Sequence, residues 1–429
     1  MTNKTLKSKK QFALGSIIFI VYGLSSAQNI PTGKAFDFTV AVGSIYQPAV
    51  DTIIGGIQSP TVGFETVSNL FDNATASGFS KLNGAYNNNS AAVIRLGYRG
   101  LPLTLTTIAG SQAVIFTVPA LNQTKIFDSK PTRNENISDL RQYLKSDGGN
   151  VLNQINQQLA KSSPIDPVAG NPNSLQSQMV MGDFDRNFTQ SATNIRESTS
   201  GQTSNLIGVG ASFGSFQQGG LTSQSATLPL SYTFRSDLDP RRQLTIYAPI
   251  SVNTVSGARS YAANLGVSYR IPINDEWALT PGFGYGISGS VDLGSAASML
   301  AATVTSQYTL RMDGFDLAFG NTLGMYQSQR LNLGGYSIDP RIKNSVLRSG
   351  VLVSIPARVF DQKMSYEFSL INTLYAGTAL YSQQYNEIGF TLGTNKSADS
   401  SRGYLRAGGT YLQGQNGIKG FKLNIGYWF

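Results

Sequence analysis

The second half of the sequence alternates between apolar and polar residues in one short stretch after another. In the last stretch, FKLNIGYWF (421–429), every second residue from Phe421 to Phe429 is apolar, whereas Lys422, Asn424 and Gly426 lie between them. Successive side chains of a β-strand point to opposite faces, so this pattern predicts a strand with one apolar and one polar side. The same alternation recurs in EWALTPGFGYGIS (276–288) and LAATVTSQYTLR (300–311).

The polar face of these stretches consists mostly of Gly, Ser, Thr and Asn. Charged residues make up only 13% of the chain, against about 25% in an average soluble protein, while glycine accounts for 45 residues. Small polar residues facing inward and bulky apolar residues facing outward are typical of a transmembrane β-barrel, whose strands need about 9–11 residues. We therefore predict an all-β transmembrane antiparallel barrel of about 12 strands at 204–429. The predicted strands are 205–214, 223–235, 242–253, 260–271, 276–289, 299–311, 314–326, 345–356, 363–375, 379–393, 402–413 and 418–429.

The connections between these strands alternate in length. PIND (272–275) and MDG (312–314) are short, whereas VDLGSAAS (291–298) and the connection at 327–344 are longer. Short turns at one rim and longer loops at the other are typical of bacterial outer-membrane barrels.

The C-terminus adds a more local signal. The chain ends on Phe429, with Tyr427 two residues before it and Ile425 two residues before that. With this ending and the alternating strands, the sequence resembles bacterial outer-membrane β-barrel proteins, which typically finish on such an aromatic pattern. The resemblance implies the outer membrane of a Gram-negative bacterium, contact with outer-membrane lipid, and a role for Phe429, Tyr427 and Ile425 as the signal that barrel-assembly machinery reads.

The start of the chain predicts export. Residues 1–10 carry four lysines and no acid, an apolar run follows from Phe12 to Leu24, and small residues stand at Ser25 and Ala27. This order is typical of a secretory signal peptide at 1–27, because the run is shorter than the roughly 20 residues of a spanning helix. The rest of the chain is only mildly basic and has no basic run, so no nucleic-acid partner is expected.

Residues 28–163 predict a small soluble α+β domain. AAVIRLGYRG (91–100) and LPLTLTTIAG (101–110) are strand-like runs bounded by glycine, and 151–163 has apolar residues at helical spacing. Residues 164–203 then form a proline-rich connector followed by a possible helix.

A helix directly ahead of a C-terminal barrel resembles the layout of autotransporters, in which a helix threads the pore and joins a passenger to the barrel. This resemblance implies a non-enzymatic outer-membrane barrel that anchors or translocates its N-terminal domain. The alternative is an outer-membrane channel whose N-terminal domain is a periplasmic gate or adaptor, with a lumen that favours anions. In both cases we expect a protein partner for the domain, at the cell surface or in the periplasm.

The sequence contains neither histidine nor cysteine. Dyads and triads that need histidine or cysteine are therefore excluded, and neither residue can act as a metal ligand. We expect no catalytic residues, no metal site and no cofactor.

The remaining candidate site is the lumen. By the phases of the strands, seven basic and three acidic residues face inward: Arg235, Arg270, Arg311, Arg348, Arg402, Arg406, Lys422, Asp316, Glu367 and Glu387. These charges form either a structural salt-bridge network or a cationic lumen that holds a threaded segment or passes anions. The segment with Asp183, Asp185 and Glu197 is the possible plug.

Overall fold

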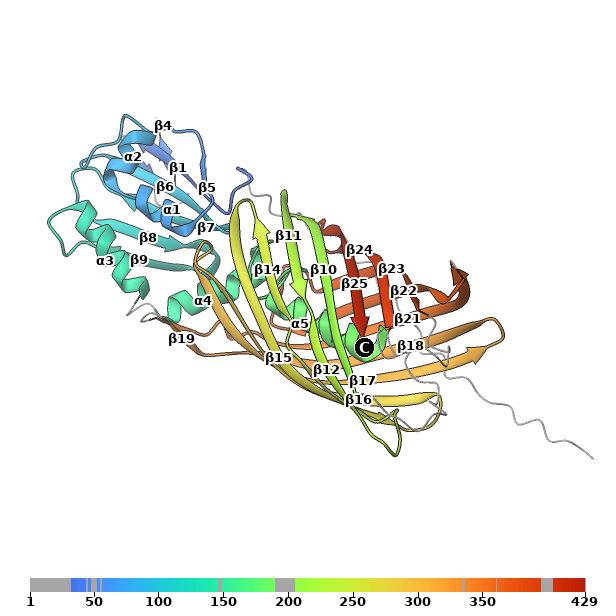
Figure 1. Ribbon diagram of the computed structural model, residues 1–429. Coiled ribbons are helices and arrows are strands. Elements are labelled where there is room, and N and C mark those ends of the chain that lie inside the picture. The colour runs from blue at the N-terminus through green and yellow to red at the C-terminus, as the bar shows by residue number, and fades with distance from the viewer. Residues whose placement is uncertain are drawn as a thin grey trace, which may run out of the picture.

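The computed structural model describes residues 32–43, 45–47, 52–54, 56–145, 149–189, 205–333, 336–359, 361–394 and 404–428. Phe429, Arg402, Glu197 and the predicted signal peptide lie outside these ranges. Figure 1 shows two parts, a small domain of strands and helices at one end and a β-barrel at the other.

The N-terminal domain is built on an antiparallel sheet, in which seven strands are described. The strand order is β4-β1-β6-β7-β8-β9, and β5 also pairs with β1. The bounds are β1 Phe36–Gly43, β4 Ile57–Gln58, β5 Val62–Phe64, β6 Ala91–Tyr98, β7 Leu101–Thr107, β8 Val114–Val118 and β9 Gln123–Phe127, with β2 (Ile45–Gln47) and β3 (Thr52–Ile54) as a separate pair.

The helices of this domain are α1 (Val67–Asn73), α2 (Ala76–Leu82), the short η2 (Pro119–Leu121), α3 (Arg133–Lys145) and α4 (Gly149–Ser162). Two of them begin at threonine caps: the side chain of Thr66 accepts a hydrogen bond from Asn69 N, and that of Thr75 accepts one from Gly78 N. Strands and helices together confirm the predicted small α+β domain.

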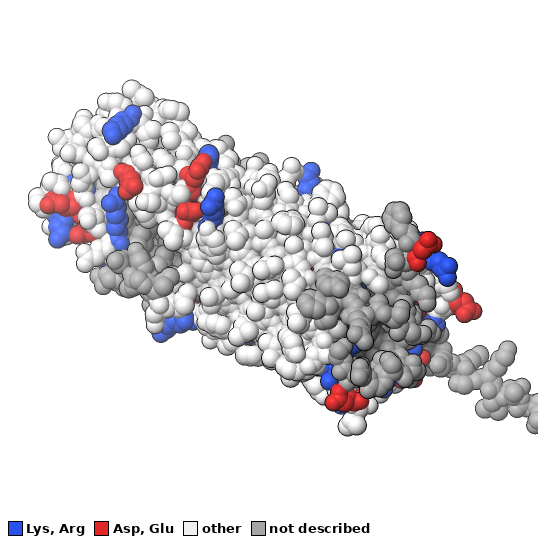
Figure 2. Space-filling view, in the orientation of Figure 1, with Lys and Arg blue, Asp and Glu red and all other residues white. Residues whose placement is uncertain are grey.

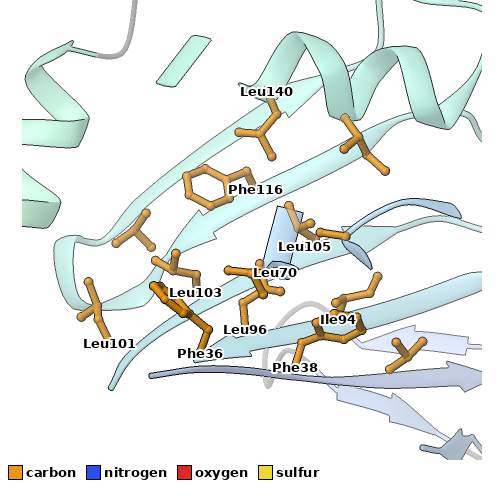
Figure 3. Close-up of a cluster of buried hydrophobic side chains, with 14 of the residues drawn as sticks. Phe36, Phe38, Leu70, Ile94, Leu96, Leu101, Leu103, Leu105, Phe116 and Leu140 are labelled. Carbon is orange, nitrogen blue, oxygen red and sulfur yellow. The ribbon is translucent and has the colours of Figure 1, made fainter. Parts of the chain in front are cut away.

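The core of the N-terminal domain lies between the sheet and its helices. Phe36 and Phe38 of β1, Leu105 of β7, Phe116 of β8 and Leu140 of α3 are among its buried side chains (Figure 3). Side chains from the rim of the barrel join the same cluster, namely Leu221, Val255 and Ala258 at strand ends and Leu293 in a turn. The domain is therefore packed onto one end of the barrel by a shared hydrophobic core.

The barrel contains twelve antiparallel strands in the described residues, as predicted. Two of the strands are interrupted, one at Pro229 and one at Ala248–Pro249. The elements are β10 Leu206–Gln218, β11 Leu221–Leu228 with β12 Leu230–Arg235, β13 Gln243–Tyr247 with β14 Ile250–Val255, β15 Ala258–Pro272, β16 Trp277–Ser290, β17 Ser295–Met312, β18 Phe315–Gln329, β21 Lys343–Val359, β22 Gln362–Gly377, β23 Gln384–Thr394, β24 Tyr404–Gly414 and β25 Lys419–Trp428. The first strand, β10, pairs with the last, β25, from Gly208 opposite Trp428 to Gln217 opposite Lys419, which closes the barrel.

The outer wall of the barrel is apolar and exposed. Phe213, Leu265, Phe283, Leu323 and Phe368 are each 50–61% exposed. Figure 2 shows the side of the barrel almost free of charged residues, which gather on the N-terminal domain and at the far end. A soluble protein rarely exposes so large an apolar surface, whereas a membrane barrel needs one. Among the described helices, none combines the length and the apolar character needed to cross a bilayer.

The tenth predicted strand, 379–393, was placed too early: β23 begins at Gln384. The residues before it form a loop that holds the connector from the N-terminal domain. Tyr381 N donates to Ala160 O at 2.8 Å, and Ser382 N donates to Gly170 O at 3.0 Å. Tyr381 and Ser382 therefore bond to the connector, and not to a neighbouring barrel strand as the alternation had suggested.

Candidate functional site in the barrel lumen

The connector from the N-terminal domain enters the mouth of the barrel. Residues 163–177 are buried throughout, although a proline-rich segment of this kind usually lies on a surface. Gly170 bends the chain there with φ +93°, and a Cβ at this position would lie 2.4 Å from Ala160 O. Only glycine fits such a turn without strain.

Polar side chains of the barrel mouth hold this segment. Asn173 Nδ2 donates to Ser223 Oγ at 2.7 Å, and Gln176 Nε2 donates to Asn344 Oδ1 at 2.9 Å. Both pairs are buried, so each satisfies groups that would otherwise be desolvated without a partner.

The helix α5 (Leu175–Phe184) follows inside the barrel and continues as a π-helical turn, η3 (Asp185–Thr189). It begins at Ser174, whose side chain accepts a hydrogen bond from Ser177 N. Figure 1 shows α5 surrounded by the barrel strands. Most of its side chains are buried, as expected of a helix enclosed on all sides.

Glycines on the inner face of the wall make room for this helix. A Cβ at Gly286 would lie 2.6 Å from the sulfur of Met179, and one at Gly320 would lie 2.4 Å from the ring of Phe188. The small residues that predicted an inward face therefore have a second effect, because they let a helix pack closely against the strands.

Asp183 forms a buried polar contact between the helix and the wall. Its carboxylate accepts hydrogen bonds from Tyr247 Oη at 2.9 Å and Tyr326 Oη at 3.0 Å, and lies 2.6 Å from Nη2 of Arg186. The guanidinium of Arg186 also stacks over the ring of Tyr247, 3.3 Å from its centroid. The side chain of Asp183 is 3% exposed, so its charge is balanced inside the lumen rather than by water.

Asp185 contacts two of the predicted lumen cations. Its carboxylate lies 3.2 Å from Nζ of Lys422 and 3.8 Å from Arg348. Arg348, which is fully buried, also pairs with Glu387 at 2.6 Å and donates to Thr373 Oγ1 at 2.5 Å. The structure thus joins a plug residue to a network of inward charges.

Arg406 forms a second contact between the wall and the segment in the lumen, toward the end of the barrel opposite the N-terminal domain. It pairs with the buried Glu367 and donates to the backbone oxygen of Thr189 at 2.8 Å. Two of the basic residues predicted to face the lumen, Arg348 and Arg406, are therefore paired with the two predicted glutamates.

The other predicted lumen charges in the described residues lie toward the rim opposite the N-terminal domain. Arg270 is half-buried and donates to Arg241 O at 3.1 Å. Arg311 is exposed and lies opposite Asp316 in the pairing of β17 with β18, and Arg235 ends β12.

Tyr247, Tyr326 and Arg186 were not among the site residues predicted from the sequence. By the alternation of their strands, both tyrosines face inward among small residues. A large side chain with a hydroxyl on that face was the signal in the sequence that could have indicated a contact in the lumen. Arg186 precedes the first strand and carries no strand phase, so its position in the lumen depends on the path of the helix.

A buried ion pair joins the N-terminal domain to the connector that enters the barrel. Arg99 lies in the turn between β6 and β7, and its Nη1 is 2.9 Å from Oδ1 of Asp166. The other carboxylate oxygen of Asp166 accepts from Val168 N and Ala169 N, both at 3.2 Å. Burial raises the pKa of the Asp166 carboxyl, and the charge of Arg99 opposes this shift.

Little free space remains in the lumen. A cavity of about 220 Å³ lies beside the helix, lined by Met179, Asp185 and Arg186 on one side and by residues of β10, β24 and β25 on the other. Within the described ranges, no group of three or more Asp, Glu, His or Cys side chains is placed to hold a metal ion.

The closed barrel of twelve antiparallel strands, with its exposed apolar wall, is an outer-membrane β-barrel. The protein accordingly resides in the outer membrane of a Gram-negative bacterium, and its layout is autotransporter-like. Ile425 faces outward on the last strand, with 54% of it exposed. The side chain of Tyr427 and all of Phe429 lie outside the described part, so the assembly signal remains a prediction.

Comparison with solved structures finds barrels of this kind. The β domain of the Bordetella autotransporter BrkA matches with 10% identity and a TM-score of 0.41, over 53% of this chain and 99% of that one. The translocator domain of the autotransporter NalP from Neisseria meningitidis matches with 11% identity and a TM-score of 0.41, over 59% and 96%. An outer membrane channel from Pseudomonas putida F1 matches with 9% identity and a TM-score of 0.36, over 55% and 99%. No protein-family model matches the sequence, and no curated protein matches it.

Proposed function

We propose that this protein is a non-enzymatic outer-membrane translocator and anchor that displays its N-terminal domain at the cell surface. The observation that carries the proposal is the path of residues 163–189. They run from the domain into the barrel and reach Arg406 near the end where β10 begins. Residues 163–189 therefore lie in the mouth and lumen of the barrel, between the domain and the end at which β10 begins.

The orientation of the barrel supports display rather than retention in the periplasm. The start of β10 and the end of β25 lie at the same end, since Gly208 pairs with Trp428. Two-residue turns lie at both rims, 313–314 at that end and 256–257 at the other, where Ser256 Oγ donates to Gly33 O of the domain at 2.7 Å. The expected division into short turns at one rim and longer loops at the other is therefore wrong for these strands. The longest connection between barrel strands, 330–342 between β18 and β21, lies at the domain's rim, and in bacterial barrels the longer loops face outward.

The alternative function, an anion-leaning channel, finds less support. The lumen holds α5 packed against the wall, with a cavity of about 220 Å³ beside it. In the proposed orientation, the domain also lies at the outer rim, which is the wrong end for a periplasmic adaptor. An open channel would require α5 to leave the lumen.

The chain has no cysteine, so single cysteines can report which end faces outward. Asn88→Cys lies on the exposed surface of the N-terminal domain, and Asp313→Cys lies in an exposed short turn at the other end. We expect a membrane-impermeant maleimide to label Asn88→Cys on intact cells and to label Asp313→Cys only after the outer membrane is permeabilised. The reverse pattern would contradict surface display and favour a periplasmic domain.

A further inference from the structure

A second cavity lies where the N-terminal domain meets the outside of the barrel. Its volume is about 1380 Å³, above the roughly 300–1,000 Å³ of common small-molecule pockets. Leu105 and Phe116 of the sheet and Leu140 of α3 line it from the domain side. Ile250, Tyr261 and Ile287 line it from the barrel side.

The barrel side of this cavity belongs to the lipid-facing wall. Ile250 and Ile287 are 51% and 46% exposed, and both pair with Ala263 of β15, so they lie at one level a few residues below the rim. Tyr261, one step nearer the rim, is 54% exposed. The cavity is therefore continuous with a surface that contacts membrane lipid.

The lining is apolar in the interior, with charge confined to a few positions. Besides the hydroxyls of Tyr98 and Tyr261, the polar members are Arg141, Asn156, Arg259, Asp292 and three serines. Nη2 of Arg141 donates to Phe71 O at 2.6 Å. Arg259 is exposed and lies at the end of β15 nearest the N-terminal domain. An apolar space of this size offers water few partners, and an empty one leaves its lining without dispersion contacts.

We propose that this cavity binds a phosphate-bearing lipid of the adjoining leaflet, with an acyl chain inserted between the sheet, α3 and the barrel wall. The chain supplies the missing apolar contacts, and the anionic phosphate lies toward Arg259 and Arg141. The proposal goes beyond surface display and does not depend on it, because bilayer lipid reaches this wall in either orientation of the barrel.

The test uses the full-length protein in liposomes that contain a phosphatidylglycerol with a diazirine at the end of one acyl chain. After illumination, we expect crosslinks to peptides from residues 101–145 in addition to peptides of the barrel wall. Crosslinks to barrel peptides alone would overturn the proposal. Labelling of 101–145 by a diazirine-bearing free fatty acid, but not by the phospholipid, would also overturn it, because the ligand would then not come from the bilayer.

Two glycines provide a matched pair of variants. Gly289 faces outward inside the cavity, and a Cβ there meets no atom within 4 Å. Gly409 also faces outward, on β24, and its nearest contact would be Leu423 at 3.4 Å. We expect Gly289→Phe to abolish labelling of 101–145 and Gly409→Phe to leave it intact, with both variants folded by heat-modifiable mobility. Unchanged labelling in Gly289→Phe would overturn this entry route.

The headgroup has a separate readout. Arg259→Gln is expected to lower labelling of 101–145 by the phosphatidylglycerol probe but not by a diacylglycerol probe that carries the same diazirine and no phosphate. Equal labelling of Arg259→Gln and wild type by phosphatidylglycerol would overturn the phosphate contact.

Discussion

Asp185 of the lumen segment lies 3.2 Å from Nζ of Lys422 on β25, the strand that closes the barrel against β10. The two residues are 237 positions apart, and they meet only when the barrel is closed around the segment. Asp183, two residues earlier, contacts β13 and β18 through Tyr247 and Tyr326. The lumen segment and the wall therefore form one packed unit.

The first prediction concerns Asp183. Asp183→Ala leaves Arg186 and two tyrosine hydroxyls in the lumen without their acceptor, and loss of one partner of a buried pair typically costs about 3–5 kcal/mol. We expect a clear fall in the temperature at which the folded protein converts to the unfolded form on a semi-native gel. Asp275→Ala removes one of the two aspartates that pair with Arg241, at a side chain that is 83% exposed, and an exposed pair contributes about 0–1 kcal/mol. Equal effects of the two substitutions would show that the Asp183 contacts do not stabilise the protein.

The second prediction tests the two faces of β16. Phe283 faces outward near the middle of the strand and is 52% exposed, so Phe283→Lys places a charge in lipid at a cost of about 2–4 kcal/mol near the bilayer midplane. Gly284 faces inward, and a Cβ there would meet Tyr247 Oη at 3.1 Å. We expect Gly284→Ser to have a small effect on barrel assembly and Phe283→Lys a large one, measured as the heat-modifiable fraction in membranes. A larger effect of Gly284→Ser would mean that the assigned faces are reversed.

The barrel could be predicted because its strands carry a period of two residues that the chain must keep in lipid. The interruptions of two strands could not be predicted in this way. Pro229 and Pro249 break these strands, but the alternation of apolar and polar residues keeps the same phase on both sides. The same limit applies to the loop before Gln384, where backbone bonds to the connector decide the boundary. Such contacts depend on elements far apart in the sequence.

The lumen was predictable in part for a similar reason. Strand phase places Arg348, Arg406 and Lys422 inward, but it does not say which acid each one meets. The pairing of Lys422 with Asp185 depends on the depth to which α5 enters the barrel. That depth is set by packing of Met179 and Phe188 against inward glycines, which a single sequence does not reveal.

The third prediction is a pH dependence at the junction of domain and barrel. Burial raises the pKa of Asp166 above its usual value of 3.8, so the folded chain holds this proton more tightly than the unfolded chain does. The carboxyl therefore favours folding at low pH, and this contribution is lost as pH rises from the unfolded pKa through the folded pKa. We expect the urea midpoint for unfolding of the N-terminal domain to fall with rising pH more steeply in wild type than in Asp166→Asn.

The urea midpoint of the N-terminal domain is measured by limited proteolysis in urea at several pH values between about 3 and 7. That window spans the usual pKa of an aspartate carboxyl and values above it. Asp72→Asn, at an exposed position on α1, is the control and should leave the slope unchanged. A wild-type slope no steeper than that of Asp166→Asn would contradict a raised pKa at this carboxyl.

The last prediction concerns ion passage. In the described part of the lumen wall, six basic residues (Arg235, Arg270, Arg311, Arg348, Arg406 and Lys422) stand against three acidic ones (Asp316, Glu367 and Glu387). With the plug in place, Asp185 offsets part of this surplus and α5 fills the space. We expect the whole protein to show low conductance in planar bilayers. A chain that begins at Asn205 behind a signal peptide should show a larger conductance that prefers anions, because fixed positive charge in a narrow lumen attracts them. Lys422→Gln in the shortened chain should weaken that preference. Cation preference in the shortened chain would show that the inward arginines do not set the field, and equal conductance of the two chains would show that α5 does not block the pore.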